Sequence, residues 1–334
     1  MTPLRIGIIG TGNMGQEHAR RLAGVPGAAL VAVADVNVEQ AKRVAEAAGA
    51  RALADSHELI GSDAVEAVLI ASPSDTHEEF TQACIAAGKP MFCEKPLAPT
   101  ADACLRVLAA ETAQPRRLVQ VGFMRRYDDD FRALKQTLDS GQLGRALLLH
   151  CRHRNPDSLP GFTSDMMITD SMVHDIDMTR WLLGQEVTAA SVFQPRSSSL
   201  APEGLLDPQL VLLETAEGVV VDVESFVNCQ YGYDIRYELV GETGTASLGE
   251  TAGVHVRQRG RHHGRVPASY QERFGSAYQR ELRAWVAGAC SGELTGPSTW
   301  DGYATTAVAE ACVQALHEGC RATVALADRP AFYA

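Results

Sequence analysis

The hydrophobic and polar positions of the first 122 residues alternate between short apolar runs and longer amphipathic stretches. The apolar runs predict buried strands, and the stretches with a helical period predict helices packed on them. We expect strands at 4–9, 29–34, 65–71, 90–93 and 118–122, and helices at 13–23, 38–48, 76–87 and 100–112. This strand–helix rhythm predicts a parallel sheet with helices on both faces.

The pattern changes after Gly122. A run rich in β-branched residues extends from 187 to 258 and contains strands that mostly lack intervening helices, so it predicts an antiparallel sheet. The remaining elements expected here are a strand at 146–153 and helices at 128–140, 170–183, 276–290 and 302–318. The fold class is therefore α/β, with an N-terminal domain over 1–123 and a C-terminal α+β domain over 124–334. The second domain is expected to be built on a large, mainly antiparallel open sheet.

A glycine-rich turn follows the first expected strand. It reads Gly10-Thr11-Gly12-Asn13-Met14-Gly15 and leads directly into a helix. Glycine permits the tight turn and the close approach of a pyrophosphate, which then lies over the positive end of the helix. The N-terminal domain is thus expected to be a Rossmann domain that binds a dinucleotide through these residues.

Asp35 follows the second expected strand, twenty residues after Gly15. Its carboxylate is placed to accept hydrogen bonds from the adenosine ribose and to repel a 2′-phosphate, which favours NAD over NADP. The alternative is that the glycines only form a turn and that Asp35 only caps the next helix.

Two further segments follow expected strands, where open α/β sheets bind their ligands. The polar loop Ser72–His77 would pass over the nicotinamide side of the cofactor, with Ser72, Ser74 and His77 as candidate ligands. A helix cap made by Ser74 or Thr76 is a compatible alternative. The run Glu94-Lys95-Pro96 places a lysine close to the reacting carbon.

Composition narrows the functional class. The net charge of -11 argues against a nucleic-acid surface. No signal peptide or apolar segment of about twenty residues is present, so we expect a cytoplasmic protein that does not insert into a membrane. The eight cysteines form no C-x-x-C pair, and no metal site is expected.

These motifs resemble those of the Gfo/Idh/MocA oxidoreductases. Other runs resemble the inositol 2-dehydrogenase branch of that family, and the resemblance covers nearly the whole chain. These runs are Gly122–Asp128, His153–Pro156, Thr169–Asp175, Ser269–Phe274 and Pro297–Tyr303. The resemblance implies a second domain that binds substrate and forms a homotetramer through its sheet faces.

Oxidation of a secondary alcohol requires a group that accepts the hydroxyl proton. Neutral imidazole suits this task, and Asp170 and His174 lie four residues apart on an expected helix, so they share a face. Lys95 can stabilise negative charge on the substrate oxygen. The resemblance assigns catalysis to these same three residues. Asp170 could instead be a helix cap, and Asp177 is a rival for its role, whereas Asp175 adjoins His174 and is expected to point elsewhere.

A cyclic polyol needs many polar partners. The resemblance assigns Lys95, Asp170 and His174 to the substrate, together with four pocket residues at matched positions: Arg125, His153, Asn155 and Tyr233. Arg126, Tyr231 and Tyr237 remain open alternatives. Glu94 joins the cofactor site by its place in the Glu-Lys-Pro run.

The expected reaction is NAD-dependent oxidation of myo-inositol to 2-keto-myo-inositol (scyllo-inosose), a step of inositol catabolism, with His174 as general base. The alternatives are the same chemistry on scyllo- or chiro-inositol, or on an aldose such as glucose. A noncatalytic regulator that senses NAD or a sugar is a more distant possibility, because fold does not dictate function.

Overall fold

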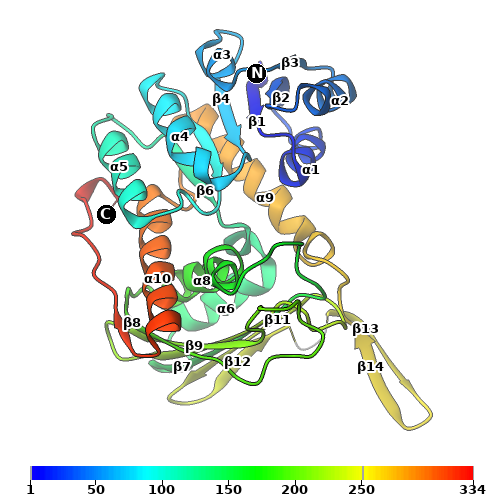
Figure 1. The fold of residues 1–334 in the computed structure, drawn as a ribbon, viewed down its shortest axis with the longest axis vertical. Coiled ribbons are helices and arrows are strands. Elements are labelled where there is room, and N and C mark those ends of the chain that lie inside the picture. The colour runs from blue at the N-terminus through cyan, green and yellow to red at the C-terminus, as the bar shows by residue number, and fades with distance from the viewer. Residues whose placement is uncertain (1, 250–251, 334) are drawn as a thin grey trace. The chain divides into compact units, whose positions relative to one another are not determined.

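The structure is a computed structural model that describes residues 2–249 and 252–333 (Figure 1). The chain forms two compact units. The first comprises Met1–Met124, Tyr278–Thr306 and Ala327–Ala334, and the second comprises Arg125–Ala277 and Ala307–Leu326.

The first unit contains a six-stranded sheet in the order β3-β2-β1-β4-β5-β6, with every pair of neighbours parallel. This is the strand order of a dinucleotide-binding fold, so the expected Rossmann domain is confirmed. The strands are β1 (Leu4–Ile9), β2 (Ala28–Ala34), β3 (Arg51–Leu53), β4 (Ala67–Ile70), β5 (Met91–Glu94) and β6 (Val119–Gly122). Strand β4 is buried along its whole length, as expected for a parallel strand covered on both faces.

Helices connect these strands: α1 (Asn13–Leu22), α2 (Val38–Ala48), α3 (Ser56–Gly61), α4 (His77–Ala86) and α5 (Ala101–Thr112), with a 3₁₀ turn at Ser74–Thr76 before α4. Strand β3 and helix α3 were not expected from the sequence. They have three and six residues, which is too short for either hydrophobic period to show.

Helices α9 (Tyr270–Ser291) and α10 (Thr299–Glu318) contribute residues to both units. In the first unit, Trp285 is fully buried and its ring lies 5.8 Å from that of Phe92, edge to face. Leu282 and Val286 join the same core cluster as Ile6. The first unit therefore draws part of its core from the end of the chain, whereas the expected division at residue 123 follows chain order.

The second unit contains a seven-stranded sheet in the order β12-β11-β7-β10-β9-β8-β15. Only β7 and β10 are parallel, so the expectation of a mainly antiparallel sheet is confirmed. The strands are β7 (Ala146–Arg154), β8 (Val187–Phe193), β9 (Gln209–Thr215), β10 (Val220–Phe226), β11 (Asp234–Gly241), β12 (Thr245–Leu248) and β15 (Ala322–Thr323). Buried positions alternate with partly exposed ones along β9 and β10, which shows that one face of the sheet packs on the core.

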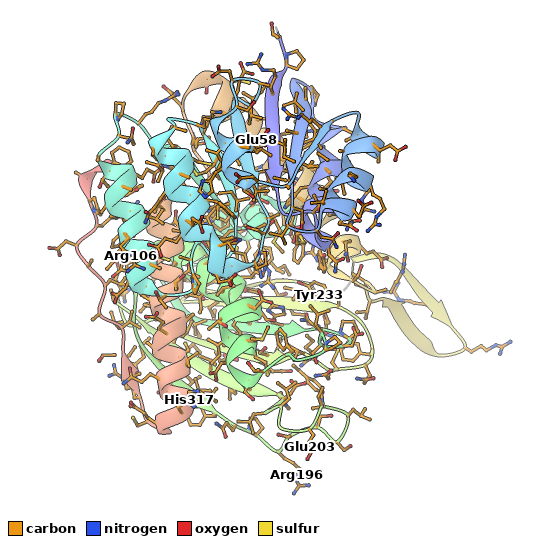
Figure 2. All side chains as sticks on the ribbon, turned by 45° about the horizontal axis from the view of Figure 1, so that its top comes forward. Glu58, Arg106, Arg196, Glu203, Tyr233 and His317 are labelled. Carbon is orange, nitrogen blue, oxygen red and sulfur yellow. The ribbon has the colours of Figure 1, made fainter. Side chains whose placement is uncertain are left out.

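A two-stranded hairpin of β13 (Ala252–Gln258) and β14 (Arg261–Arg265) extends from this unit (Figure 1). The other helical elements of the unit are a 3₁₀ turn at Met124–Tyr127, helix α6 (Asp129–Asp139), the short α7 (Ser164–Met166), a π-helical turn at Met167–Met172 and helix α8 (Val173–Leu183). The segment between β8 and β9 carries Arg196 and Glu203 (Figure 2).

The helix expected to begin near Asp170 begins earlier, at Ser164. Asp170 lies inside the π-helical turn that leads into α8, so its interpretation as a helix cap is wrong. Thr163 caps this helical segment instead, because its side chain accepts a hydrogen bond from the backbone nitrogen of Met166. Single π turns inside helices are frequent at functional sites.

Candidate active site

The glycine-rich turn joins β1 to α1 in the first unit. Gly10 has a φ of +87°, and a Cβ there would lie 2.5 Å from the backbone nitrogen of Ser72. A Cβ on Gly15 would come within 1.9 Å of the Gly10 carbonyl oxygen. By contrast, a Cβ on Gly12 would meet no atom of the described residues within 4 Å. Packing therefore requires glycine at positions 10 and 15, while Gly12 leaves open space at the first turn of α1.

This open space suits a phosphate. The first amides of α1 belong to Asn13 and Met14, and the first turn contains no acidic side chain. A phosphate there would lie at the amides of the first turn and at the positive end of the helix dipole. The turn thus fits the pyrophosphate of a dinucleotide.

Asp35 lies directly after β2 and is linked to the same turn. Its Oδ2 accepts hydrogen bonds from the backbone nitrogen of Thr11 at 2.6 Å and from the Thr11 hydroxyl at 2.8 Å, and Oδ1 accepts from the Asn37 nitrogen at 2.8 Å. Burial alone would raise the pKa of this carboxyl, but these hydrogen bonds outweigh burial and lower it. The ionised carboxylate retains lone pairs for ribose hydroxyls. Asn37, rather than Asp35, caps α2.

The loop after β4 is fixed by its own hydrogen bonds. The hydroxyls of Ser72 and Thr76 lie 2.7 Å apart, and Thr76 also donates to the Pro73 carbonyl oxygen at 2.7 Å. Thr76 occupies the N-cap position of α4, as that alternative expected, but its side chain makes no capping hydrogen bond there. The contacts of Ser72 and Ser74 with a dinucleotide remain predictions.

His77 links this loop to the Glu94-Lys95-Pro96 segment. Its Nδ1 lies 2.7 Å from the Pro96 carbonyl oxygen, and its Nε2 lies 2.9 Å from the Ser72 carbonyl oxygen. Burial lowers the pKa of the imidazole, although the two carbonyls favour its charged form. The structure thus shows His77 holding two backbone segments, and its own contact with the cofactor stays a prediction.

Glu94 holds the backbone beside Lys95. Its Oε1 lies 2.6 Å from Nε2 of the buried His18, and its Oε2 accepts from the Lys95 backbone nitrogen at 3.2 Å. His18 was not identified from the sequence, since its partner lies 76 positions away. These contacts orient the strand end that carries Lys95, whose side chain is partly exposed.

The second unit contains a buried cluster around Asp175. Arg125 donates from Nη1 to Asp175 Oδ1 at 2.7 Å, and Tyr237 donates to the same oxygen at 2.5 Å. His153 Nδ1 lies 2.5 Å from Asp175 Oδ2, and Arg125 Nη2 lies 3.2 Å from the same ring nitrogen. Asp175 and Arg125 are 0% and 1% exposed.

This cluster keeps Asp175 charged. Burial by itself would raise the pKa of the carboxyl, but the positive charge of Arg125 and the hydrogen bonds from His153 and Tyr237 hold it well below its usual range. From the sequence, Asp175 was expected to point away from His174, and no role was assigned to Asp175. No local signal could reveal one, because Arg125 and His153 lie 50 and 22 positions away along the chain.

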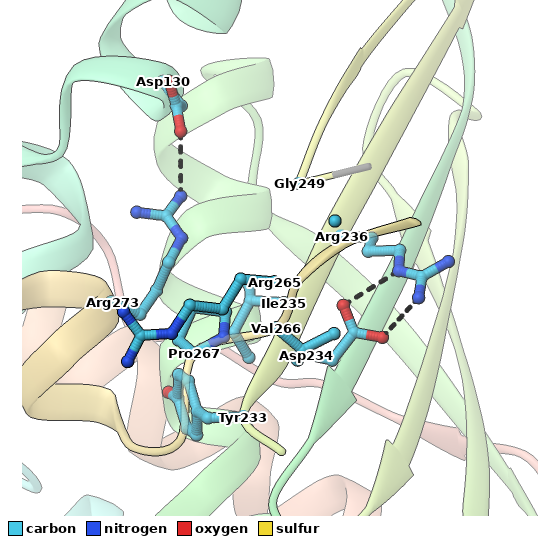
Figure 3. Close-up of a pocket in the computed structure, with 11 residues that line it drawn as sticks. Asp130, Tyr233, Asp234, Ile235, Arg236, Gly249, Arg265, Val266, Pro267 and Arg273 are labelled. Atoms are coloured by element: carbon cyan, nitrogen blue, oxygen red, sulfur yellow. Dashed lines mark hydrogen bonds and ion pairs between the residues drawn. The ribbon is translucent and has the colours of Figure 1, made fainter. Parts of the chain in front are cut away.

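Three tyrosines were candidates for the pocket. Tyr231 is half exposed and donates to Asp234 at 2.6 Å, and Tyr237 belongs to the Asp175 cluster. Tyr233, which is labelled in Figure 2, is buried. Its ring centroid lies 6.2 Å from that of His153. Tyr233 also lines a cavity with Val266, Pro267, Arg273 and neighbouring residues of β11 and β14, as Figure 3 shows.

The remaining predicted residues of this unit occupy adjoining elements. His174 is buried in the first turn of α8, and Asp170 is partly exposed on the π-helical turn before it. Asn155 directly follows β7, and its side-chain oxygen is buried without a hydrogen-bond partner among the described residues. Such an acceptor is suited to a ligand hydroxyl.

Among the side chains that the structure describes, no group of three or more His, Cys, Asp or Glu residues is arranged to hold a metal ion. Within the same residues, no helix has both the length and the apolar character needed to cross a bilayer.

Comparisons with known proteins agree with this geometry. Residues 4–123 match the family profile described as an oxidoreductase family with an NAD-binding Rossmann fold, and residues 131–247 match the GFO/IDH/MocA C-terminal domain. The chain is 51% identical to an inositol 2-dehydrogenase of Azotobacter vinelandii over 334 residues, covering 99% of each chain. It is 49% identical to an inositol 2-dehydrogenase of Burkholderia cenocepacia over 333 residues, again covering 99% of each.

A solved structure is similar over the whole chain. The myo-inositol dehydrogenase of Lactobacillus casei, in complex with NAD(H) and myo-inositol, has a TM-score of 0.97 and 35% identity, and 100% of each chain is covered.

Proposed function

Because this chain belongs to the Gfo/Idh/MocA oxidoreductase family, we propose that it is an NAD-dependent inositol 2-dehydrogenase. The reaction is the oxidation of myo-inositol to 2-keto-myo-inositol (scyllo-inosose) at a CH–OH group. The observation that carries this proposal is the full-length similarity to a dehydrogenase solved with NAD(H) and myo-inositol. Lys95, Asp170 and His174 are all present, which argues against a noncatalytic regulator.

NAD supplies the chemistry of hydride acceptance when it is bound. The amides after Gly12 would hold the pyrophosphate, and Asp35 would accept hydrogen bonds from the adenosine ribose. The Ser72–His77 loop, fixed by its internal hydrogen bonds, is proposed to line the nicotinamide side. An ionised Asp35 disfavours the 2′-phosphate of NADP by charge repulsion.

His174 is proposed to accept the hydroxyl proton. An imidazole titrates near working pH, so it can take the proton as the carbonyl forms and release it later. Asp170, four residues earlier, is proposed to orient the ring and to stabilise the imidazolium. Lys95 is proposed to stabilise negative charge that develops on the substrate oxygen.

The pocket residues of the second unit are proposed to recognise a polyol. Arg125 supplies donors, Asn155 supplies a buried acceptor, and His153 and Tyr233 lie within one ring contact of each other. A ligand that lacks a matching hydroxyl would leave one of these buried groups unpaired, which penalises its binding.

Assembly and location are proposed on the family resemblance alone. The chain is proposed to form a homotetramer through the sheet face of its second unit and to act in the cytoplasm. Light scattering at working concentration tests the assembly, since a monomeric mass would overturn it.

The decisive experiment is absorbance at the NADH band with purified protein, NAD and a panel of inositols and aldoses. Rapid NADH formation with myo-inositol would support the proposal. Activity only with scyllo- or chiro-inositol, or with glucose, would support the proposed mechanism but would show that myo-inositol is not the substrate. No reduction with any compound would overturn the assignment as a dehydrogenase of this class.

A further inference from the structure

We infer that Asp175 is a positioning residue. It orients His153 so that the imidazole accepts a hydrogen bond from a hydroxyl group of the substrate. Asp175 would fix the imidazole as the tautomer that carries its proton on Nδ1, so that Nε2 acts as a hydrogen-bond acceptor. The inference rests on the proposed function only in placing His153 at the substrate. It concerns selectivity for individual hydroxyls of a polyol, beyond the oxidation itself.

The first step in the argument is the contact between the two side chains. His153 Nδ1 lies 2.5 Å from Asp175 Oδ2, and both side chains are buried. An ionised carboxylate has lone pairs but no proton to donate. Arg125 donates to Asp175 Oδ1 at 2.7 Å and Tyr237 donates to the same oxygen at 2.5 Å, and both contacts favour the ionised carboxylate. The proton of the hydrogen bond between Asp175 and His153 therefore belongs to Nδ1 of His153.

The second step concerns the charge on the imidazole. Arg125 Nη2 lies 3.2 Å from Nδ1 and 3.5 Å from Nε2 of His153. A guanidinium is always positive, so it opposes a second positive charge at this distance. When His153 is neutral, the positive charge of Arg125 and the negative charge of Asp175 cancel. With His153 protonated, the buried group would carry a net positive charge, which is costly away from water.

The third step follows from the tautomer. A neutral imidazole protonated at Nδ1 has its lone pair on Nε2. Toward a polyol, such a nitrogen favours a hydroxyl that donates its proton and disfavours a group that can only accept. Asp175 therefore acts through His153 and need not touch the substrate. A second effect is that Arg125 is held in place by the same carboxylate.

A matched control exists on the same strand. His150 of β7 contacts Asp222 of β10 through its Nδ1, and both side chains are partly exposed. His150 lies three positions before His153, so the alternation of a strand directs it to the opposite face of the sheet. Asp222→Asn removes a comparable Asp–His contact without touching the Asp175 cluster.

The first measurement is the protonation of His153 in the wild-type protein. Long-range ¹⁵N–¹H NMR of histidine labelled on the ring distinguishes the two neutral tautomers, and His153→Asn identifies the signal. We expect a proton on Nδ1 and none on Nε2 at neutral pH. A proton on Nε2, or on both nitrogens, would overturn the inference. This measurement does not depend on activity, so it stands even if no inositol is oxidised.

The second measurement compares kcat/KM for myo-inositol and for its deoxyfluoro analogues, in which one hydroxyl becomes an acceptor without a proton. Wild type should lose about 10- to 100-fold at one position, the range expected for an unpaired buried acceptor. Asp175→Asn presents an amide to Nδ1 and should reduce that ratio to about threefold or less, while Asp222→Asn keeps it. A ratio that is unchanged in Asp175→Asn, or equal losses with all analogues, would refute the role in selectivity.

Discussion

Arg126 donates two hydrogen bonds to the carboxylate of Asp177, from Nε to Oδ2 at 2.9 Å and from Nη2 to Oδ1 at 2.5 Å. Asp177 is almost fully buried, and both of its oxygens take part. Because both carboxylate oxygens of Asp177 bind Arg126, Asp170 is the better candidate for the residue that orients the imidazole of His174. The same ion pair gives Arg126 a structural partner.

The two aspartates should respond differently to the same substitution. Asp177→Asn breaks a buried ion pair and should lower the free energy of unfolding by about 3–5 kcal/mol. Asp170→Asn should lower kcat by about 10- to 1,000-fold with little loss of stability, because it weakens support for the imidazolium. Urea unfolding and steady-state kinetics on both variants separate the effects. A larger fall in kcat for Asp177→Asn than for Asp170→Asn would reverse the assignment.

His174→Ala should lower kcat by about 10²- to 10⁴-fold, the usual contribution of a positioned base, and should change KM little. The matched control is His57→Ala, which removes an exposed histidine that pairs with Glu79 and should leave kcat unchanged. An effect of His174→Ala confined to KM would argue that this residue binds substrate and does not accept its proton.

Lys95→Ala should remove most of the activity and leave NAD binding intact, because the lysine is assigned to the developing charge on the substrate oxygen. Titration of NAD by calorimetry and turnover measurements give the two readouts independently. Lys42→Ala, at an exposed lysine of α2 paired with Glu39, serves as the control. Unchanged turnover in Lys95→Ala would remove this residue from the mechanism.

Asp35→Asn should reduce the preference for NAD over NADP by about 10- to 100-fold, because hydrogen bonds to a charged group contribute about 1.5–3 kcal/mol. The preference is measured as the ratio of kcat/KM values with the two cofactors. Asp63→Asn changes an exposed acid of the same unit and should leave the ratio unaffected. A wild-type enzyme that strongly prefers NADP would contradict the role given to Asp35.

The carboxyl of Asp175 should contribute to acid sensitivity. Its pKa is lowered in the folded protein relative to about 3.9 in the unfolded chain. Its contribution to stability is therefore complete above the unfolded value and is lost as pH falls from there toward the folded value. Asp175→Asn should be less stable than wild type at pH 7, and the difference should narrow below about pH 4. A difference that stays constant from neutral to acidic pH, measured by urea unfolding, would show that the charge of Asp175 does not stabilise the fold.

The amino-acid sequence by itself determined the features that depend on neighbouring residues. Five of the six Rossmann strands, all but the short β3, follow from the local hydrophobic period, and the glycine turn follows from a backbone conformation that favours glycine, as at Gly10. The mainly antiparallel sheet followed in the same way from strands without intervening helices.

The tertiary structure alone decided which charged side chains meet. Asp175 and Asp177 are two positions apart, yet one lies at the centre of the cluster with Arg125 and His153 while the other pairs with Arg126. Strand register and the π-helical turn before α8 bring these partners together across long stretches of chain, and no local period encodes them. For the same reason, the sequence did not show that α9 completes the core of the first unit. The neighbours of a residue along the chain predict its backbone conformation, whereas the partners of its side chain depend on how distant elements pack.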